Sequence, residues 1–104
     1  MENVALWVQL EAKKGKEAEV ETLLRESLSI ATRETGTVSW YALKLGPTSY
    51  GIFDTFQTNK DREAHLAGEI AKSLQEKASD LFSKPPTIER IDILASKLPE
   101  LEQY

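Results

Sequence analysis

Hydrophobic and polar side chains alternate at the start of the chain, over residues 4–12. One set of alternate positions is apolar throughout and comprises Val4, Leu6, Val8 and Leu10. The other set ends in Gln9 and Glu11. A period of two residues is typical of a β-strand, because successive side chains point to opposite faces of the sheet. The pattern therefore predicts a first strand over residues 4–12.

A period of three to four residues follows the polar turn at 13–16 and predicts a first helix. The recurring positions are Val20, Leu23, Leu24, Ser27, Leu28 and Ala31. Gly36 suits the left-handed backbone that often ends a helix, so we expect this helix to end near Glu34. Residues 37–45 and 50–57 then predict two strands, joined as a hairpin by the turn residues at 46–49.

Helical spacing returns after Thr58 and Asn59, either of which can cap a helix that begins near Lys60. Gly68 predicts a bend, and the helical pattern continues until Pro85 and Pro86 stop it. Alternation resumes over residues 88–97 and predicts the last strand.

The order of these elements is β-α-β-β-α-β, which is the ferredoxin-like split βαβ arrangement of the α+β class. It predicts a four-stranded antiparallel sheet with the helices on one face. A chain of 104 residues fits one domain, so we expect a single domain over residues 1–104. Residues 99–104 form a short polar tail that is expected to fray or to hook a partner.

The second face of the predicted sheet is also apolar, although no helix is expected to cover it. The second strand places Val38, Trp40 and Ala42 on one face and Tyr41, Leu43 and Leu45 on the other. An exposed apolar sheet favours aggregation unless a two-fold partner covers it. The pattern therefore predicts a homodimer in which two sheets form a dimeric α/β barrel.

Composition narrows the function classes. Thirteen basic and seventeen acidic residues give a net charge of -4, which does not favour nucleic acid as a partner. The absence of cysteine excludes disulfides, thiolate zinc sites and thiol nucleophiles. Neither a stretch of about 20 apolar residues nor a signal-peptide pattern is present, so we expect a cytoplasmic protein without a membrane partner.

Motifs of several enzyme classes are also absent. The sequence has no Gly-rich phosphate loop, no histidine pair at metal spacing and no Gly-x-Ser-x-Gly. Nucleotide, zinc and serine-hydrolase functions are therefore not expected, and no metal site is predicted.

Four short motifs follow one another along nearly the whole chain. They are Leu6-Trp7-Val8, Lys14-Gly15-Lys16-Glu17, Glu34-Thr35-Gly36-Thr37-Val38-Ser39-Trp40, and the segment from Asp54 to His65-Leu66. Together, and in this order, they resemble the antibiotic biosynthesis monooxygenase (ABM) family. The family's acidic residue, aromatic residue and histidine fall on Asp54, Phe56 and His65.

This resemblance implies a dimer of ferredoxin-like subunits, each with a pocket between sheet and helices. Several ABM members oxidise quinols or aromatic polyketides with O2 and without metal or flavin. The resemblance thus implies a cofactor-independent monooxygenase acting on a small aromatic or quinol-type compound. One branch of the superfamily degrades haem with an Asn, Trp and His set, and the corresponding residues here are Val8, His65 and Gln75, which speaks against that activity.

His65 and Asp54 are the candidate catalytic residues. His65 is the only histidine and the only side chain whose ordinary pKa suits proton transfer near neutral pH. The alternative is that His65 pairs at the surface with Asp61 and Glu69. Asp54 shares a strand face with apolar neighbours, where burial would make it a base or a hydrogen-bond acceptor. Alternatively it is a structural carboxylate at a strand end.

Aromatic residues are candidates for binding a flat substrate, above all Trp40 and Phe56, with Trp7 beside them. Aromatic side chains on sheet faces are also common as core or dimer contacts. Two other functions stay open: a non-catalytic dimeric module that binds a small hydrophobic ligand, and a stress-related protein that acts on a reactive carbonyl.

Overall fold

The computed structural model describes residues 2–99, in which strands and helices alternate as the sequence predicts. The elements are β1 (Val4–Glu11), α1 (Glu17–Arg33), β2 (Thr37–Lys44), β3 (Ser49–Phe56), α2 (Asn59–Leu66), α3 (Glu69–Leu81) and β4 (Thr87–Asp92). The predicted bend at Gly68 is a complete break that separates α2 from α3. The predicted α+β, ferredoxin-like fold is confirmed.

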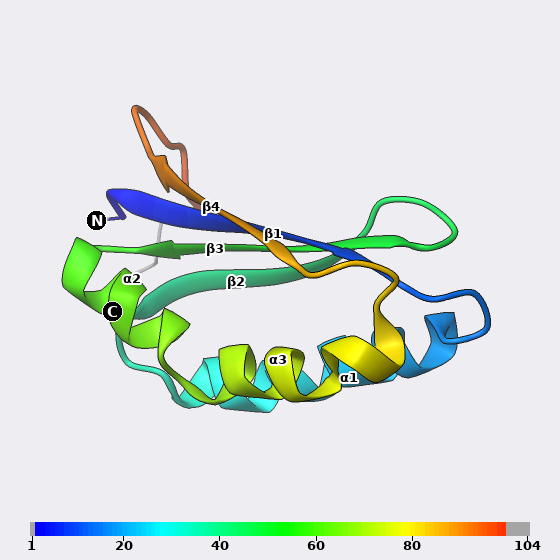
Figure 1. Cartoon of the computed structure of the whole chain (residues 1–104). Helices are drawn as coiled ribbons and strands as arrows, with labels where there is room; N and C mark the ends of the chain where they lie inside the picture. The colour runs from blue at the N-terminus through cyan, green and yellow to red at the C-terminus, as the bar shows by residue number, and fades with distance from the viewer. Residues whose placement is uncertain (1, 100–104) are drawn as a thin grey trace.

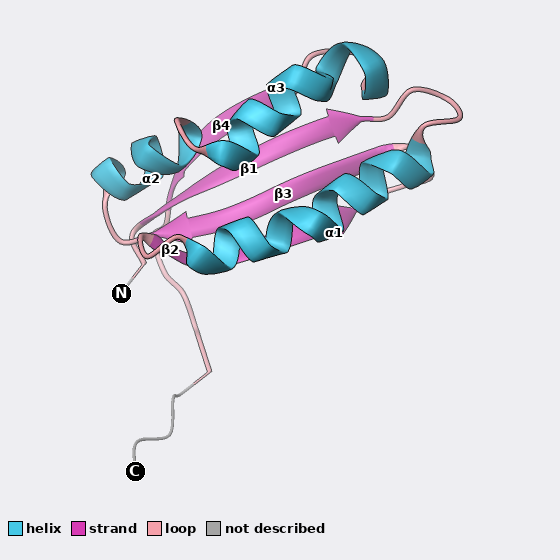
Figure 2. Cartoon of the chain, turned by 90° about the horizontal axis from the view of Figure 1, so that it is seen from below, coloured by secondary structure: helices cyan, strands magenta, loops and turns pink. Residues whose placement is uncertain are grey.

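The four strands form one antiparallel sheet in the order β2-β3-β1-β4. All helices lie on the same face of this sheet, which Figure 1 shows from the side and Figure 2 from the helical layer. We call the covered face the inner face and the other the outer face. β1 and β3 are central, so side chains at their inner positions lie deepest in the molecule.

The core lies between the inner face and the helices. The sheet contributes Leu10, Tyr50, Ile52 and others, and the helices contribute Val20, Leu24, Ile70 and Leu74, all nearly or fully buried. These helical residues occupy the predicted period of three to four. Apolar burial of this kind is the main favourable term in folding.

None of the helices in residues 2–99 lies over the outer face, which carries aromatic and aliphatic side chains. Trp7, Tyr41 and Phe53 occupy neighbouring positions across three strands, and the rings of Tyr41 and Phe53 are 6.5 Å apart. The Trp7 ring lies over Gly51 so closely that a Cβ there would be 2.3 Å from Trp7 Cη2. Leu43 belongs to the same face.

This face stays partly open to solvent. The exposed fractions of Tyr41, Leu43 and Leu45 are 52%, 36% and 49%. The predicted apolar second face is therefore present in the folded subunit.

Two details differ from the prediction. The last strand ends at Asp92 rather than at Lys97, because Asp92 pairs with Val4, the first residue of β1, and β1 offers no further partner. Leu94, beyond this point, is 98% exposed. A bulge between Thr37 and Ser39 also interrupts the alternation that was expected to place Val38 with Trp40. Most of the predicted tail lies outside the described residues.

Candidate functional site

A cavity of about 220 Å³ lies between the inner face of the sheet and the helices α2 and α3. Its walls are mainly aliphatic and include Leu6, Val8, Ile52, Ile70, Leu74 and Ile88. Three polar side chains also line it: His65, Gln75 and Arg90. An apolar cavity with a few convergent polar groups is the usual form of a small-molecule site.

His65 reaches this cavity because α2 is fixed against the sheet. The Thr58 side chain accepts a hydrogen bond from the Asp61 backbone N–H at 3.1 Å and caps the helix, as predicted. Arg62 is buried, and its Nη1 donates to the carbonyl oxygens of Ala5 at 3.2 Å and Ile91 at 3.1 Å. His65 follows Arg62 by three residues and lies on the same side of the helix.

The His65 imidazole lies between two carboxylates. Its Nδ1 is 2.7 Å from Glu34 Oε1, and its Nε2 is 2.8 Å from Asp54 Oδ2. Asp54 is 1% exposed and His65 8%. The contact with Glu34 is a well-aligned hydrogen bond, whereas the contact with Asp54 is close but bent, so neither Asp54 oxygen has an aligned side-chain donor. The alternative pairing of His65 with Asp61 and Glu69 is wrong.

Burial and mutual charge shift the pKa values of the two central groups. Burial raises the pKa of Asp54, and His65 only partly offsets this effect. Burial is also the largest single influence on His65 and acts to lower its pKa, but Asp54 and Glu34 together outweigh it and raise that pKa. Each of the two groups therefore influences the protonation of the other.

The predicted catalytic residues are thus side by side, whereas none of the three predicted aromatic residues lines this cavity. The Phe56 ring lies 5.3 Å from the His65 ring, but behind the cavity wall. Trp40 pairs with Asp54 across β2 and β3 and packs against the core, with its Nε1 buried and unpartnered among the described residues. Trp7 lies on the outer face, since it alternates with Leu6.

Sequence reasoning missed Glu34 and Arg62. Glu34 lies in the third of the four motifs, where its segment was interpreted only as a helix stop. Nothing in the periodicity marks Arg62 as buried, because a charged residue on a short polar helix is usually exposed. Val8 and Gln75, which correspond to positions of the haem-degrading branch, do line the cavity together with His65.

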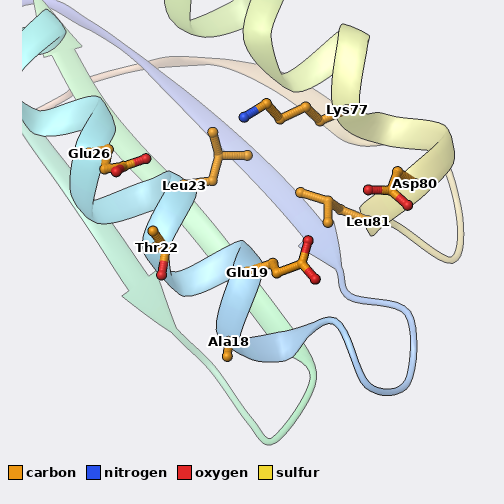
Figure 3. Close-up of a pocket in the computed structure, with 8 residues that line it drawn as sticks. All are labelled: Ala18, Glu19, Thr22, Leu23, Glu26, Lys77, Asp80 and Leu81. Carbon is orange, nitrogen blue, oxygen red and sulfur yellow. The ribbon is translucent and has the colours of Figure 1, made fainter.

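A second hollow, of about 400 Å³, separates α1 from α3 on the helical side. Figure 3 shows Glu19 on α1 and Asp80 on α3 reaching toward each other across it. Lys16 lies 3.4 Å from Glu19 and 3.6 Å from Asp80, so these charges form exposed ion pairs. Such surface pairs are usually weak, and the hollow contains no buried reactive group like the pair at His65.

Two further findings concern the part of the chain that the structure describes. No group of three or more His, Cys, Asp or Glu side chains there is arranged to hold a metal ion. No helix in residues 2–99 is both long and apolar enough to span a membrane.

Comparison with known proteins identifies one close structural relative. No protein-family model and no curated protein matches the sequence. The crystal structure of a protein of unknown function from Nitrosomonas europaea has a TM-score of 0.93 and 47% identity, and the match covers 96% of this chain and 97% of that one.

More distant structures carry a functional name. A "Putative antibiotic biosynthesis monooxygenase" from Nitrosomonas europaea has a TM-score of 0.78 and 19% identity, with 88% of this chain and 90% of that one covered. Another with that name, from Caulobacter crescentus, has a TM-score of 0.76 and 14% identity, covering 90% and 92%. At such identities the likeness shows the fold, and the predicted resemblance to the ABM family is confirmed at that level.

Proposed function

We propose that this chain, which belongs to the family of the Nitrosomonas europaea protein of unknown function and has the ABM fold, is a monooxygenase that oxidises a small aromatic or quinol-type compound with O2. The observation that carries the proposal is the aliphatic cavity with His65 at its wall, whose Nε2 lies 2.8 Å from the buried Asp54 Oδ2. A buried carboxylate beside an imidazole forms a suitable acid–base pair.

The chemistry needs a base and a dry environment. Removal of a proton from a phenol or enol leaves an electron-rich anion that reduces O2. For an anthrone, the CH2 group and O2 give a carbonyl group and water. For a hydroquinone, the compound and O2 give a hydroxyquinone and water, so in both reactions the substrate supplies all the electrons. The aliphatic walls keep water from the anion, and the imidazole supplies the proton acceptor near neutral pH.

The cavity limits the size of the substrate. Its volume of about 220 Å³ is below the range of roughly 300–1,000 Å³ typical of sites for drug-sized ligands. A cavity of about 150 Å³ holds benzene. We therefore expect a compound of one or two rings rather than a large polycyclic one.

The same proposal includes a homodimer. The exposed Tyr41, Leu43 and Leu45 lie on the outer face with Trp7 and Phe53, and no helix covers them. A second copy of the chain, offering the same face, is the simplest partner for such a surface. The cavity lies between the inner face and the helices, on the opposite side of the sheet from the outer face.

Oxygen uptake tests the function. The purified protein is given hydroquinones, naphthoquinols and anthrones, and wild type is compared with His65→Ala, Asp54→Asn and the matched control Glu69→Gln, whose side chain is exposed. Uptake lost in the first two variants and kept in the control supports the enzyme and its site. Uptake unchanged in all variants contradicts the site.

A second variant separates an enzyme from a binding module. Ala71 lines the cavity, and Ala71→Met adds side-chain volume there. If wild type binds these compounds in calorimetry without consuming O2, and Ala71→Met abolishes the binding, the cavity belongs to a non-catalytic ligand-binding protein instead.

A further inference from the structure

A third ionisable group, Glu34, completes the arrangement around His65. It is the C-terminal cap of α1 and has an extended backbone, with φ -80° and ψ 114°. Its Oε1 also accepts a hydrogen bond from Thr37 Oγ1 at 3.2 Å. Two contacts therefore hold the carboxylate in place beside the imidazole.

We propose that Glu34 is the positioning residue of this site: it holds the proton of His65 on Nδ1, so that Nε2, beside Asp54, is the atom that accepts the substrate's proton. The role of Nε2 in the reaction rests on the proposed function. The position of the proton on Nδ1 does not depend on the proposed function, because it follows from the contacts of His65 in the protein without substrate.

The two carboxylates differ in a way that decides which one orients the ring. Glu34 makes a hydrogen bond to Nδ1 at 2.7 Å, and its side chain is 23% exposed. Asp54 is almost fully buried and makes only a bent contact. A carboxylate beside one imidazole nitrogen selects the tautomer with hydrogen on that nitrogen and leaves the other nitrogen basic.

The proton transfer then balances. The O–H bond of the substrate breaks, an N–H bond forms at Nε2, and the electron pair stays on the substrate oxygen. Asp54 Oδ2 lies 2.8 Å from Nε2, so the charge of this carboxylate stabilises the imidazolium.

Glu34 also offers a route by which the Nδ1 proton of His65 can reach solvent. It lines a separate hollow of about 250 Å³ between the end of α1 and β2, together with Leu28, Thr32 and Trp40. His65 lines the aliphatic cavity, so the imidazole lies between the two spaces. A proton accepted at Nε2 can thus be matched by release from Nδ1 through Glu34 to solvent.

Other charged groups around His65 are already engaged. On α2, the Arg62 guanidinium donates to backbone carbonyl oxygens. On β4, Arg90 lines the same cavity, but its Nε donates to Glu63 at 2.8 Å. Asp54 on β3 and Glu34 in the loop before β2 are therefore the groups that control the protonation of His65.

The test uses the fact that the chain has one histidine. In the 15N-labelled protein, the two ring nitrogen shifts report the tautomer and their pH dependence reports the titration of His65 without ambiguity. We expect Glu34→Ala to abolish the preference for the Nδ1–H form and to move the titration midpoint to lower pH. Glu34→Gln keeps an acceptor oxygen, so we expect the tautomer to stay and only the midpoint to fall.

Glu69→Gln is the matched control, because it removes the same charge from a side chain that is 73% exposed. It should change neither the tautomer nor the midpoint. A midpoint in Glu34→Gln equal to that of wild type overturns the proposal, and this variant suffices if Glu34→Ala does not fold.

Kinetics test the catalytic consequence separately. With a substrate from the oxygen-uptake panel, Glu34→Gln should lower kcat roughly tenfold with little change in KM, and its pH profile should follow the shifted midpoint of His65. An unchanged profile contradicts the role of Nε2. If no compound is consumed, the proposed function fails, whereas the nitrogen shifts still decide the role of Glu34.

Discussion

The two faces of the sheet depart from the usual distribution of side chains in opposite ways: one buries a polar group and the other exposes apolar groups. The inner face is covered by helices, yet it buries Asp54 next to His65. The outer face is open, yet it presents Tyr41 and Leu43. Burying an ionisable group costs free energy unless a partner compensates it, and exposing a large apolar surface favours association. The departures from the usual pattern thus coincide with the proposed site on one face and the proposed dimer interface on the other.

The largest effect is expected on the outer face, from Leu43→Glu. A charge on this face should prevent the pairing of two sheets and reduce the measured mass to that of one chain, 11.7 kDa. Light scattering after size-exclusion chromatography gives this mass. Leu28→Glu, at an exposed leucine on α1, is the control and should leave the mass unchanged. A dimer that persists in Leu43→Glu would contradict this interface.

The next effect concerns the anchor of the inner face. We expect Arg62→Ala to lower the free energy of unfolding by about 3 kcal/mol, because it removes a buried donor from two backbone carbonyl oxygens. Chemical denaturation at a fixed protein concentration measures the change. Arg25→Ala, at an exposed position, should cost less than about 0.5 kcal/mol. Equal costs would show that Arg62 does not hold α2 against the sheet.

A smaller effect is expected where Trp7 lies over Gly51. The added methyl group of Gly51→Ala would overlap the indole ring, so we expect a loss of about 2 kcal/mol in the free energy of unfolding. Gly46→Ala is the control, since its Cβ would meet nothing closer than Ser49 Cβ at 4.0 Å. If the two variants have the same free energy of unfolding, the Trp7 ring moves aside at little cost.

The smallest effect is a pH dependence that belongs to the inner face. The pKa of His65 is raised in the folded protein, so its contribution to stability is complete below pH 6.5 and is lost as pH rises through the folded-state pKa. Asp54→Asn removes the main cause of the raised pKa of His65. We therefore expect the midpoint temperature of thermal unfolding to decrease less steeply above pH 6.5 in this variant than in wild type. Glu69→Gln should keep the wild-type slope. If the stability of wild type instead rises with pH above pH 6.5, the pKa of His65 is not raised in the folded protein.

Most of the fold was predictable because each element has its own periodic signal. The exception is the end of β4, where alternation continued to Lys97 but Val4 is the last strand partner available in β1. The alternation of apolar residues in one strand does not reveal how far the neighbouring strand extends. The length of a strand in a sheet depends on its own sequence and on the extent of its neighbour.

The site was only half predictable. The spacing from Asp54 to His65 found the central pair through the family resemblance. Glu34 was not found, because its contact with His65 depends on how the loop after α1 meets α2, which no local pattern encodes. Trp7 was placed at the site although it alternates with Leu6, which lines the cavity, and strand parity alone places such neighbours on opposite faces.

The chain has two tryptophans, and they lie on different faces of the sheet: Trp7 on the outer face and Trp40 on the inner face, beside Asp54. Their intrinsic fluorescence is therefore divided between the two surfaces of the subunit. With Trp40 replaced by Phe, the remaining emission reports the environment of the outer face alone. With Trp7 replaced instead, it reports the neighbourhood of the buried carboxylate, so one optical signal can be assigned to either surface without any attached dye.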